Sequence, residues 1–368
     1  MVVILYHEAF TYIFTDTITQ TMKTKRHSIK DIAQTLGVSI TTVSFVLNGK
    51  AEEKRISKAM TEKILQYAKK IKYRPDNLAQ SLRTGKSKLI VCMVEDISNY
   101  FFSRLARIIE DMAYKEGYKV IFCSNENDDL RAVELIGLFK QRRIDGYIII
   151  PSPNLENKIK ELRQENIPVV LCDRFFEGLN VQHVVVNNLE SCYWGTKHLI
   201  DNGYKDIGFI ATDSDQTQMR DRLLGYERAI AEAGLNSHIL RIPYSERTGE
   251  KGKGMLKELL YGKKPIDAAF FATYYLTQKG LEVIREKSGN RDYFKNVGVI
   301  SFDDMEQFET YNPSITAIAQ PYDKIAKALI KTMLSLLNGN KLESIPNKTV
   351  LSTEFNLRQS SLTKRISF

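Results

Sequence analysis

Near the N-terminus, apolar residues recur with the spacing of two short amphipathic helices separated by a tight turn. The inward-facing residues of the first helix are Ile29, Ile32, Ala33 and Leu36, and those of the second are Val43, Val46 and Leu47. Ser28 and Ser39 can cap the two helix starts, and Gly37 suits the turn because glycine readily takes a positive φ. This is the helix-turn-helix pattern. A third helix near Lys58–Ile71 is expected to cover the pair with Ile64, Leu65, Ala68 and Ile71.

Beyond Lys88 the pattern changes to apolar runs of strand length that alternate with amphipathic helical stretches. The expected strands are Leu89–Val94, Lys119–Cys123, Gly146–Ile150, Val169–Cys172, Val184–Val186, Ile207–Ile210, Ala268–Phe271 and Val297–Ile300. The helical stretches include Phe102–Glu116, Glu190–Asn202, Asp221–Ala233 and Tyr322–Leu337. This alternation predicts doubly wound parallel sheets with helices on both faces, and the strands are enough for two sheets.

Ligands of doubly wound sheets bind beyond the carboxyl ends of the strands, so polar residues directly after strands are site candidates. Those residues are Glu95, Asp173, Arg174, Asp303 and Asp304, with Arg222 at the start of a helical stretch and the aromatic residues Phe101 and Tyr322. Carboxylates, a guanidinium and aromatic rings suit a polyhydroxylated ligand. Each residue could instead cap a helix or form a salt bridge, and we expect that role for Glu95 and Asp304.

The charge of the chain is unevenly distributed. The chain has 368 residues, enough for two or three domains, with 43% hydrophobic residues and a net charge of +9. Between Met22 and Lys88 there are 16 Lys and Arg residues against 5 Asp and Glu, whereas the remainder has 37 against 39. A basic segment joined to a near-neutral body indicates a polyanionic partner, and a solvated charged surface is the alternative.

The sequence has none of the motifs of a metal or phosphate-binding site. The four cysteines, Cys92, Cys123, Cys172 and Cys192, lack metal-ligand spacing, and there is no Gly-rich phosphate loop and no nucleophile elbow. We therefore expect no enzymatic activity, no metal and no cofactor. The thiols suit the buried, reduced cysteines of a cytoplasmic protein. No apolar run approaches the roughly 18 residues that cross a membrane.

Residues 1–21 differ from a signal peptide. They contain no Lys or Arg, His7 and Glu8 interrupt the apolar run, and no cleavage pattern follows. Met22 then begins a basic arm. We expect Met22 to be the natural start and residues 1–21 to be an upstream extension, disordered or loosely attached.

The second helix of the helix-turn-helix is expected to enter the major groove of DNA. Its outward residues are Ile40, Thr41, Thr42, Ser44 and Phe45. Hydroxyl groups can bond bases or phosphates, and apolar groups can contact thymine methyls. An ordinary two-helix corner in a small domain is the alternative.

A further short helix is predicted between Tyr73 and Lys86, where Pro75 suits the first turn and Gly85 ends the helix. It is too short to be stable alone, so it would order only against a symmetry mate and DNA. Leu82 is apolar on a basic, polar strip and is a candidate wedge between base pairs in the minor groove. A plain linker with one incidental leucine is the alternative.

Together these features resemble the LacI/GalR (lactose-repressor) family from Ser28 to about Leu357. The motifs that carry the resemblance are Ile32-Ala33, Gly37-Val-Ser39, Thr42-Val-Ser44, Val46-Leu-Asn48, and Arg74-Pro75 through Leu78-Ala-Gln-Ser-Leu82. The resemblance implies an all-α helix-turn-helix headpiece and an α/β periplasmic-binding-protein-like body of two doubly wound subdomains. It also implies a transcriptional repressor that binds a near-palindromic double-stranded DNA operator, with a sugar-type effector between the subdomains. No leucine heptads follow Leu351, so we expect a homodimer without the family's tetramer-forming tail.

The resemblance also assigns domains and residues. We expect a headpiece over 22–72, a hinge over 73–87, a sensing and dimerisation body over 88–357 and a tail over 358–368. The DNA-binding residues implied are Ser28, Lys30, Ser39, Ile40, Thr41, Thr42, Phe45, Asn48, Ala79, Leu82 and Arg83. Among them, Ile40 and Thr41 match the specificity-setting positions, Leu82 matches the hinge-helix leucine, and Ala79 lies beside it. The effector residues implied are Asp173, Arg222 and Asp303, with Phe101, Tyr274 and Gln320 as further lining residues.

Three positions depart from the family pattern. Phe45 stands where Arg is usual, so the base preference is altered, the ring contacts a methyl group, or the ring packs within the headpiece. Tyr274 stands where Asn is usual, and Tyr100 replaces the Pro of an Asn-Pro-Phe motif, so either the ligand differs from a simple hexose or the pocket is shallower. Two alternative functions differ in class. A solute-binding protein would have an export signal and no headpiece, whereas a regulator controlled by a partner protein has the same sequence features.

Overall fold

The computed structural model of the protein describes residues 27–73, 85–288 and 297–362. The upstream extension 1–21 and the hinge residues Ala79, Leu82 and Arg83 therefore lie outside the described residues. The chain divides into two units, Met1–Ser87 and Lys88–Phe368, which we call the headpiece unit and the body.

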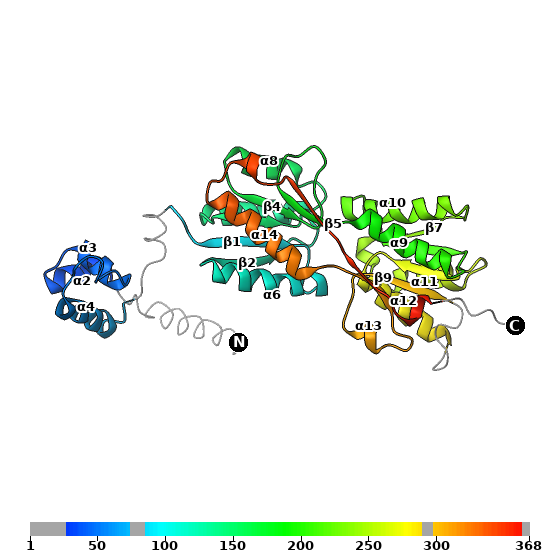
Figure 1. Ribbon diagram of the computed structural model, residues 1–368, viewed down its shortest axis with the longest axis horizontal. Helices are drawn as coiled ribbons and strands as arrows, with labels where there is room; N and C mark the ends of the chain where they lie inside the picture. The colour runs from blue at the N-terminus through cyan, green and yellow to red at the C-terminus, as the bar shows by residue number, and fades with distance from the viewer. Residues whose placement is uncertain (1–26, 74–84, 289–296, 363–368) are drawn as a thin grey trace, which may run out of the picture. The chain divides into compact units, whose positions relative to one another are not determined.

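The headpiece unit contains three helices in its described part, α2 (Ile29–Leu36), α3 (Ile40–Leu47) and α4 (Lys58–Lys70) (Figure 1). Gly37 ends α2 in the left-handed conformation with φ 65°, as the tight turn requires. The buried side chains of its core are Ile32, Ala33, Val43, Val46, Ile64 and Ala68. The expected helix-turn-helix is confirmed. The prediction for Leu65 was wrong: the residue is 47% exposed, whereas Ile64 and Ala68 are buried and Met60, Tyr67 and Ile71 pack against the core.

The first subdomain of the body is built on a six-stranded parallel sheet in the order β11-β5-β4-β3-β1-β2. Its strands are β1 (Leu89–Val94), β2 (Lys119–Ser124), β3 (Gly146–Ile149), β4 (Val169–Cys172), β5 (His183–Val186) and β11 (Lys348–Leu351). Helices α6 (Tyr100–Lys115) and α14 (Tyr322–Leu337) cover one face, and α7 (Asp129–Gln141) and α8 (Glu156–Gln164) cover the other (Figure 1). Both faces are buried, which explains the continuous apolar runs.

The second subdomain repeats this plan with the strand order β12-β10-β9-β8-β6-β7. Its strands are β6 (Ile207–Thr212), β7 (His238–Ile242), β8 (Ala268–Phe271), β9 (Gly298–Phe302), β10 (Thr316–Ala319) and β12 (Glu354–Asn356), of which only β12 is antiparallel to its neighbour. Helices α9 (Asn188–Asp201) and α10 (Thr217–Glu232) cover one face, and α11 (Glu250–Tyr261) and α12 (Tyr274–Ser288) cover the other. The short helix α13 (Gln307–Thr310) follows β9.

Three connections of the described chain pass between the subdomains. They lead from β5 to α9, from β10 to α14 and from β11 to β12 (Figure 1). Each subdomain is therefore assembled from separate parts of the sequence. This topology brings the carboxyl ends of the parallel strands of both sheets to the junction between the subdomains.

The structure differs from the sequence expectation at the sheet edges and at the C-terminus. Strands β7, β11 and β12 lie at edges and are partly exposed, so they lack a buried apolar run. The interior strand β10 was also missed, although its residues are mostly buried. Residues 358–362, the described part of the expected tail, pack into the second subdomain. Ser360 and Ser361 are buried, and Ser360 Oγ donates a hydrogen bond of 2.7 Å to the carbonyl oxygen of Val299.

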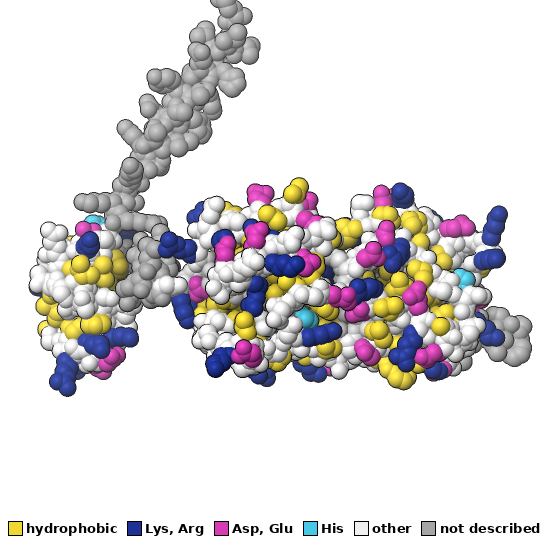
Figure 2. All heavy atoms as spheres, turned by 90° about the horizontal axis from the view of Figure 1, so that it is seen from above, with side chains coloured by type: hydrophobic (Ala, Val, Ile, Leu, Met, Phe, Trp, Pro, Cys, Tyr) yellow, Lys and Arg dark blue, Asp and Glu magenta, His cyan; other side chains and the backbone are white. Residues whose placement is uncertain are grey.

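Within the described residues, no helix is long and apolar enough to cross a membrane. Charges of both signs are interspersed over the visible face of the body, as its near-neutral composition predicts (Figure 2).

Candidate functional site

The start of helix α3 presents two side chains to solvent. The Ser39 hydroxyl accepts a hydrogen bond of 3.0 Å from the backbone N–H of Thr42, which caps the helix, and its Oγ lies 2.8 Å from Thr42 Oγ1. Ile40, directly after the cap, is 45% exposed although it is a large apolar residue, and Thr41 is exposed beside it. A capped, rigid helix start with an exposed apolar group suits contact with base edges.

Several other predicted DNA-binding residues also stabilise helix ends. Ser28 and Asp31 form a capping box at the start of α2, since the side chain of each accepts a hydrogen bond from the backbone N–H of the other. The Asn48 amide donates a hydrogen bond of 2.7 Å to the carbonyl oxygen of Ser44 at the end of α3. Lys30 lies exposed on α2. The hydrogen bonds of Ser28 and Asn48 within the headpiece leave these residues able to contact phosphates from fixed positions.

Phe45 is half-buried on α3. Among the described residues, Phe45 does not pack against the headpiece core. The Lys54 ammonium nitrogen lies 5.5 Å from the centre of the Phe45 ring. The Phe45 ring thus has a contact within the headpiece and keeps part of its surface accessible.

The six predicted effector residues all lie at the junction between the two subdomains. Asp173 follows β4, Asp303 follows β9, Gln320 follows β10, Phe101 lies in α6, Arg222 lies in α10, and Tyr274 begins α12. All six side chains are less than a tenth exposed.

Arg222 is the central cation of this group. Its Nε donates to Asn188 Oδ1 and its Nη1 to the carbonyl oxygen of Ala272, both at 2.8 Å, and its guanidinium carbon lies 3.6 Å from the centre of the Phe302 ring. Burial raises the pKa of the Asp173 and Asp303 carboxyls above their usual values, and the Arg222 charge opposes that shift in both. The structure thus brings Asp173, Arg222 and Asp303 into one electrostatic cluster.

The remaining predicted residues complete the walls of this cluster. Gln320 Nε2 donates a hydrogen bond of 2.7 Å to Asp303 Oδ1. The Phe101 ring lies 5.6 Å from the Tyr322 ring, between centres. Tyr274 has a different role from the amide that usually stands there: its hydroxyl oxygen accepts a hydrogen bond of 2.9 Å from the backbone N–H of Tyr100. Tyr274 therefore joins the first residue of α6 to the second subdomain.

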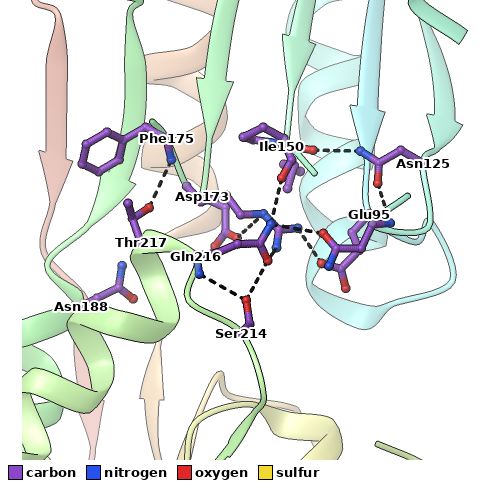
Figure 3. Close-up of polar contacts among 12 residues, drawn as sticks. Glu95, Asn125, Ile150, Asp173, Phe175, Asn188, Ser214, Gln216 and Thr217 are labelled. Atoms are coloured by element: carbon purple, nitrogen blue, oxygen red, sulfur yellow. Dashed lines mark hydrogen bonds and ion pairs between the residues drawn. The ribbon is translucent and has the colours of Figure 1, made fainter. Parts of the chain in front are cut away.

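A second group of polar side chains connects the subdomains directly (Figure 3). Arg174 Nη2 lies 2.5 Å from Glu95 Oε2, and its Nη1 donates to Gln216 Oε1 at 2.6 Å. Tyr244 Oη donates to Glu95 Oε1 at 2.7 Å. Although burial alone would lower the pKa of Arg174, the carboxylates of Glu95 and Asp173 raise it above its usual value.

The sequence identified only part of this second group. Glu95 and Arg174 follow predicted strands, and the salt-bridging role expected for Glu95 is confirmed. The same role is confirmed for Asp304, which accepts hydrogen bonds of 2.8 and 2.7 Å from Arg358. Gln216 and Tyr244 were missed. Gln216 precedes an α10 that begins earlier than expected, and Tyr244 follows the unpredicted strand β7, so neither had a periodic pattern to mark it.

A cavity of about 600 Å³ opens at the same junction. Its walls are formed by residues 151–154, 174–177 and 212–220, with Glu95, Asn127, Tyr244 and Tyr275. None of the six predicted effector residues is among them. The cavity and the buried cluster are adjacent, because Arg174 lines the cavity while its Nε lies 3.8 Å from Asp173 Oδ2.

The described residues contain no group of His, Cys, Asp and Glu side chains arranged to hold a metal ion. Cys92, Cys172 and Cys192 are buried free thiols and Cys123 is half-buried. Burial raises the pKa of the Cys123 thiol to about 11, which makes it a poor nucleophile at neutral pH.

Comparison with known proteins agrees with both units. Residues 28–76 match the domain described as bacterial regulatory proteins, lacI family, and residues 196–361 match the periplasmic binding protein-like domain. The HTH-type transcriptional regulator RegA of Clostridium saccharobutylicum is 30% identical over 337 residues, which cover 91% of this chain and 99% of RegA.

Two solved structures show the same fold. The lac repressor dimer bound to operator and the anti-inducer ONPF is similar with a TM-score of 0.78 at 20% identity, over 92% of this chain and 100% of that one. A LacI family regulator from Enterococcus faecium with bound ribose has a TM-score of 0.67 at 22% identity, over 76% and 100% of the two chains. The helix-turn-helix, the two-sheet body and the similarity to RegA over nearly the whole chain lead to one conclusion: this chain belongs to the LacI family of DNA-binding transcriptional regulators.

Proposed function

We propose that the protein is a homodimeric repressor that binds a near-palindromic DNA operator, and that a small-molecule effector, a sugar or sugar derivative, controls its operator affinity. The observation that carries the DNA-binding part is the start of α3, where Ile40 and Thr41 are exposed directly after the Ser39 cap. An exposed isoleucine directly after the cap of α3 is placed to contact a thymine methyl in the major groove.

On DNA, Ile40, Thr41 and Thr42 would contact base edges in the major groove. The Lys and Arg residues of the basic segment would contact phosphates and make the affinity salt-dependent. By family resemblance, Leu82 would insert between base pairs of the minor groove, with Ala79 and Arg83 beside it.

In the body, the effector would bind between the carboxyl ends of the two sheets. The support is the convergence of Asp173, Arg222, Asp303 and Gln320 at this junction, and the ribose bound by the similar regulator from Enterococcus faecium. The body would have two conformations that differ in the relative angle of the subdomains, one that binds the operator and one that releases it. A ligand with higher affinity for one conformation would shift the population of the protein toward it, by the difference between the two binding free energies.

Selection of bound sequences from a random DNA pool with the full-length protein tests the DNA-binding part. We expect a two-fold symmetric consensus. Ile40→Ala should then reduce discrimination at one base position in each half-site by about 1 kcal/mol, roughly fivefold. Leu65→Ala, a similarly exposed apolar residue of α4, is the matched control and should leave the consensus unchanged.

Leu82→Ala tests the hinge assignment on the same selected operator. Specific affinity should fall, while salt-dependent binding to random DNA stays nearly intact. An equal loss on random DNA would show that Leu82 is no wedge, and a pool without any enriched sequence would contradict the proposed function itself.

A further inference from the structure

The exposed cations of the body gather at the amino end of its first sheet. The carboxyl ends of the parallel strands meet at the subdomain junction, so the amino ends face away from it. We consider the connections into β1, β2 and β3, each from the last residue of the preceding helix, or from Gly85 for β1. Their cations are Lys86, Lys88, Lys115, Lys119, Arg142 and Arg143, against the carboxylates Glu116 and Asp145. We call this surface the basic end of the body.

Backbone hydrogen bonds hold the three connections of the basic end side by side. The N–H of Lys119 donates a hydrogen bond of 2.9 Å to the Lys88 carbonyl oxygen. The N–H of Lys88 donates one of 3.0 Å to Asp145 Oδ2, and the N–H of Asp145 donates one of 2.9 Å to the Leu89 carbonyl oxygen. The cations therefore belong to one surface of the folded body.

Most of these cations are available to a partner. Four of them are exposed and form no ion pair with any other described residue, namely Lys115, Lys119, Arg142 and Arg143. Lys88 is also exposed, and its Nζ lies 4.1 Å from the centre of the Tyr118 ring. In contrast, the neighbouring Lys140 is paired with Glu165 at 2.5 Å. The charge of the basic end is thus not neutralised within the described part of the protein.

The second sheet provides an internal comparison because it has the same plan. Its strands β6, β7 and β8 occupy the positions of β1, β2 and β3. The connections into them, counted in the same way, have the cations Lys205, Lys263 and Lys264 against the carboxylates Asp201, Asp206, Glu232 and Asp267. Since the two subdomains share one fold, the fold itself does not require the positive excess of the basic end.

DNA is the polyanion that this surface fits. Double-stranded DNA has one negative charge per about 1.7 Å of its axis, and closely spaced ammonium and guanidinium groups neutralise such charges. The basic end also begins where the chain enters the body at β1 (Figure 1). Only residues 74–84 separate Tyr73 of the headpiece unit from Gly85. A fully extended chain of that length spans at most about 40 Å, so DNA held by the headpiece is within reach of this surface.

We propose that the basic end of the body binds the phosphate backbone of the DNA that the headpiece recognises. The body then adds contacts that are independent of base sequence to those of the helix-turn-helix. Each phosphate neutralised in this way steepens the fall of the logarithm of the binding constant with the logarithm of salt concentration by about 0.9. This inference rests on the proposed function, because it assigns a second DNA-binding surface to the same regulator.

A pair of double variants tests the surface. Arg142→Gln/Arg143→Gln removes two charges from the connection between α7 and β3. Lys263→Gln/Lys264→Gln is the matched control, because it removes two exposed charges from the corresponding connection between α11 and β8. Fluorescence anisotropy measures binding of the full-length proteins to the selected operator over a range of KCl concentrations. The arginine variant should bind at least about threefold more weakly at about 0.1 M KCl, with a salt dependence shallower by about 1–2. The control should keep both wild-type values.

Lys119→Gln tests the same surface from the neighbouring connection, and its salt dependence should be shallower by about 1. Both variants should lose affinity for a random duplex by the same factor as for the operator, because phosphate contacts do not read bases. A loss confined to the operator overturns the inference. Equal salt dependence in the arginine variant and its lysine control also overturns it, and would favour an acidic protein as the partner of this surface.

The same measurements separate this inference from the proposed function. If the random pool yields an operator but the arginine variant binds it like the control, the basic end has no role in DNA binding and the proposed function stands. If the pool yields no enriched sequence but the arginine variant alone loses salt-dependent affinity for random DNA, the basic end binds DNA and the proposed operator specificity fails.

Discussion

Replacement of Arg222 by methionine removes the cation of the buried cluster while keeping an unbranched side chain of similar length. Arg222 is almost fully buried, and its guanidinium donates two hydrogen bonds of 2.8 Å and lies over the Phe302 ring. Without it, Asn188 Oδ1 and the Ala272 carbonyl oxygen lose their buried donor, and the carboxylates of Asp173 and Asp303 lose a neighbouring positive charge. An unsatisfied buried polar group costs about 1–3 kcal/mol, so we expect a loss of at least this size in the free energy of unfolding at pH 7.5.

Arg220→Met on the same helix is the control. Arg220 is 40% exposed and pairs with the exposed carboxylate of Glu177, and such surface pairs contribute about 0–1 kcal/mol. The difference between the two variants therefore measures the effect of burial, since both lose a guanidinium from α10.

The pH dependence of the loss has a definite sign. Burial already raises the pKa of Asp173 and Asp303 in the folded state, and removal of Arg222 raises both further. A carboxyl whose pKa is higher folded than unfolded binds more protons in the folded state, so the stability of the protein rises as pH falls. The deficit of the Arg222 variant should therefore be smaller at pH 5.5 than at pH 7.5.

Urea unfolding by far-UV circular dichroism measures both quantities, and the fluorescence of Trp194 gives a local signal. Trp194 is the only tryptophan of the chain and lies on α9, which packs against α10. A variant as stable as Arg220→Met at pH 7.5, or a deficit independent of pH, would refute the assignment of Arg222 as the cation of this cluster.

Three further predictions concern single contacts. Gly225→Ala should destabilise the body by about 1–3 kcal/mol, because a Cβ at this position would lie 2.2 Å from the Leu189 carbonyl oxygen and force α9 and α10 apart. The control Gly254→Ala, where a Cβ meets no atom within 4 Å, should stabilise the body by up to about 1 kcal/mol. Equal urea midpoints of the two variants would contradict this prediction. Tyr274→Phe should speed hydrogen exchange of the Tyr100 amide roughly fivefold, because a hydrogen bond of about 1 kcal/mol is lost, and unchanged exchange would show that the bond does not form in solution. Ser39→Ala should lower the stability of the headpiece by about 1 kcal/mol, measured by its thermal unfolding, because the cap of α3 is lost. It should also weaken specific operator binding, measured by fluorescence anisotropy. An unchanged unfolding midpoint would argue against the cap.

Local signals in the sequence sufficed for much of the fold. Ser28, Gly37 and Ser39 fixed the ends of α2 and α3, because capping and turn conformations depend on residues only a few positions apart. The same holds for α14, whose predicted bounds agree with the structure. Hydrophobic periodicity gave wrong predictions where contacts with distant segments decide whether a residue is buried or a segment forms a strand. Leu65 has the spacing of a core residue but is exposed, and β11 is a strand only because β5 offers it hydrogen bonds.

The residues that converge on the site were visible in the sequence, whereas their contacts were not. Asp173 and Asp303 could be selected because polar residues that follow buried strands end at one edge of a sheet. Arg222 could be selected because it begins a predicted helical stretch and matches the family pattern. The hydrogen bonds of Tyr244 to Glu95 and of Arg174 to Gln216 join residues 149 and 42 positions apart. Only the three crossings between the subdomains bring these residues together, and no local pattern encodes such a meeting. The sequence by itself therefore determined the family, the helix-turn-helix and the polar strand ends. The tertiary structure alone decided which groups are paired and which space stays open, because pairing and volume depend on how distant segments pack.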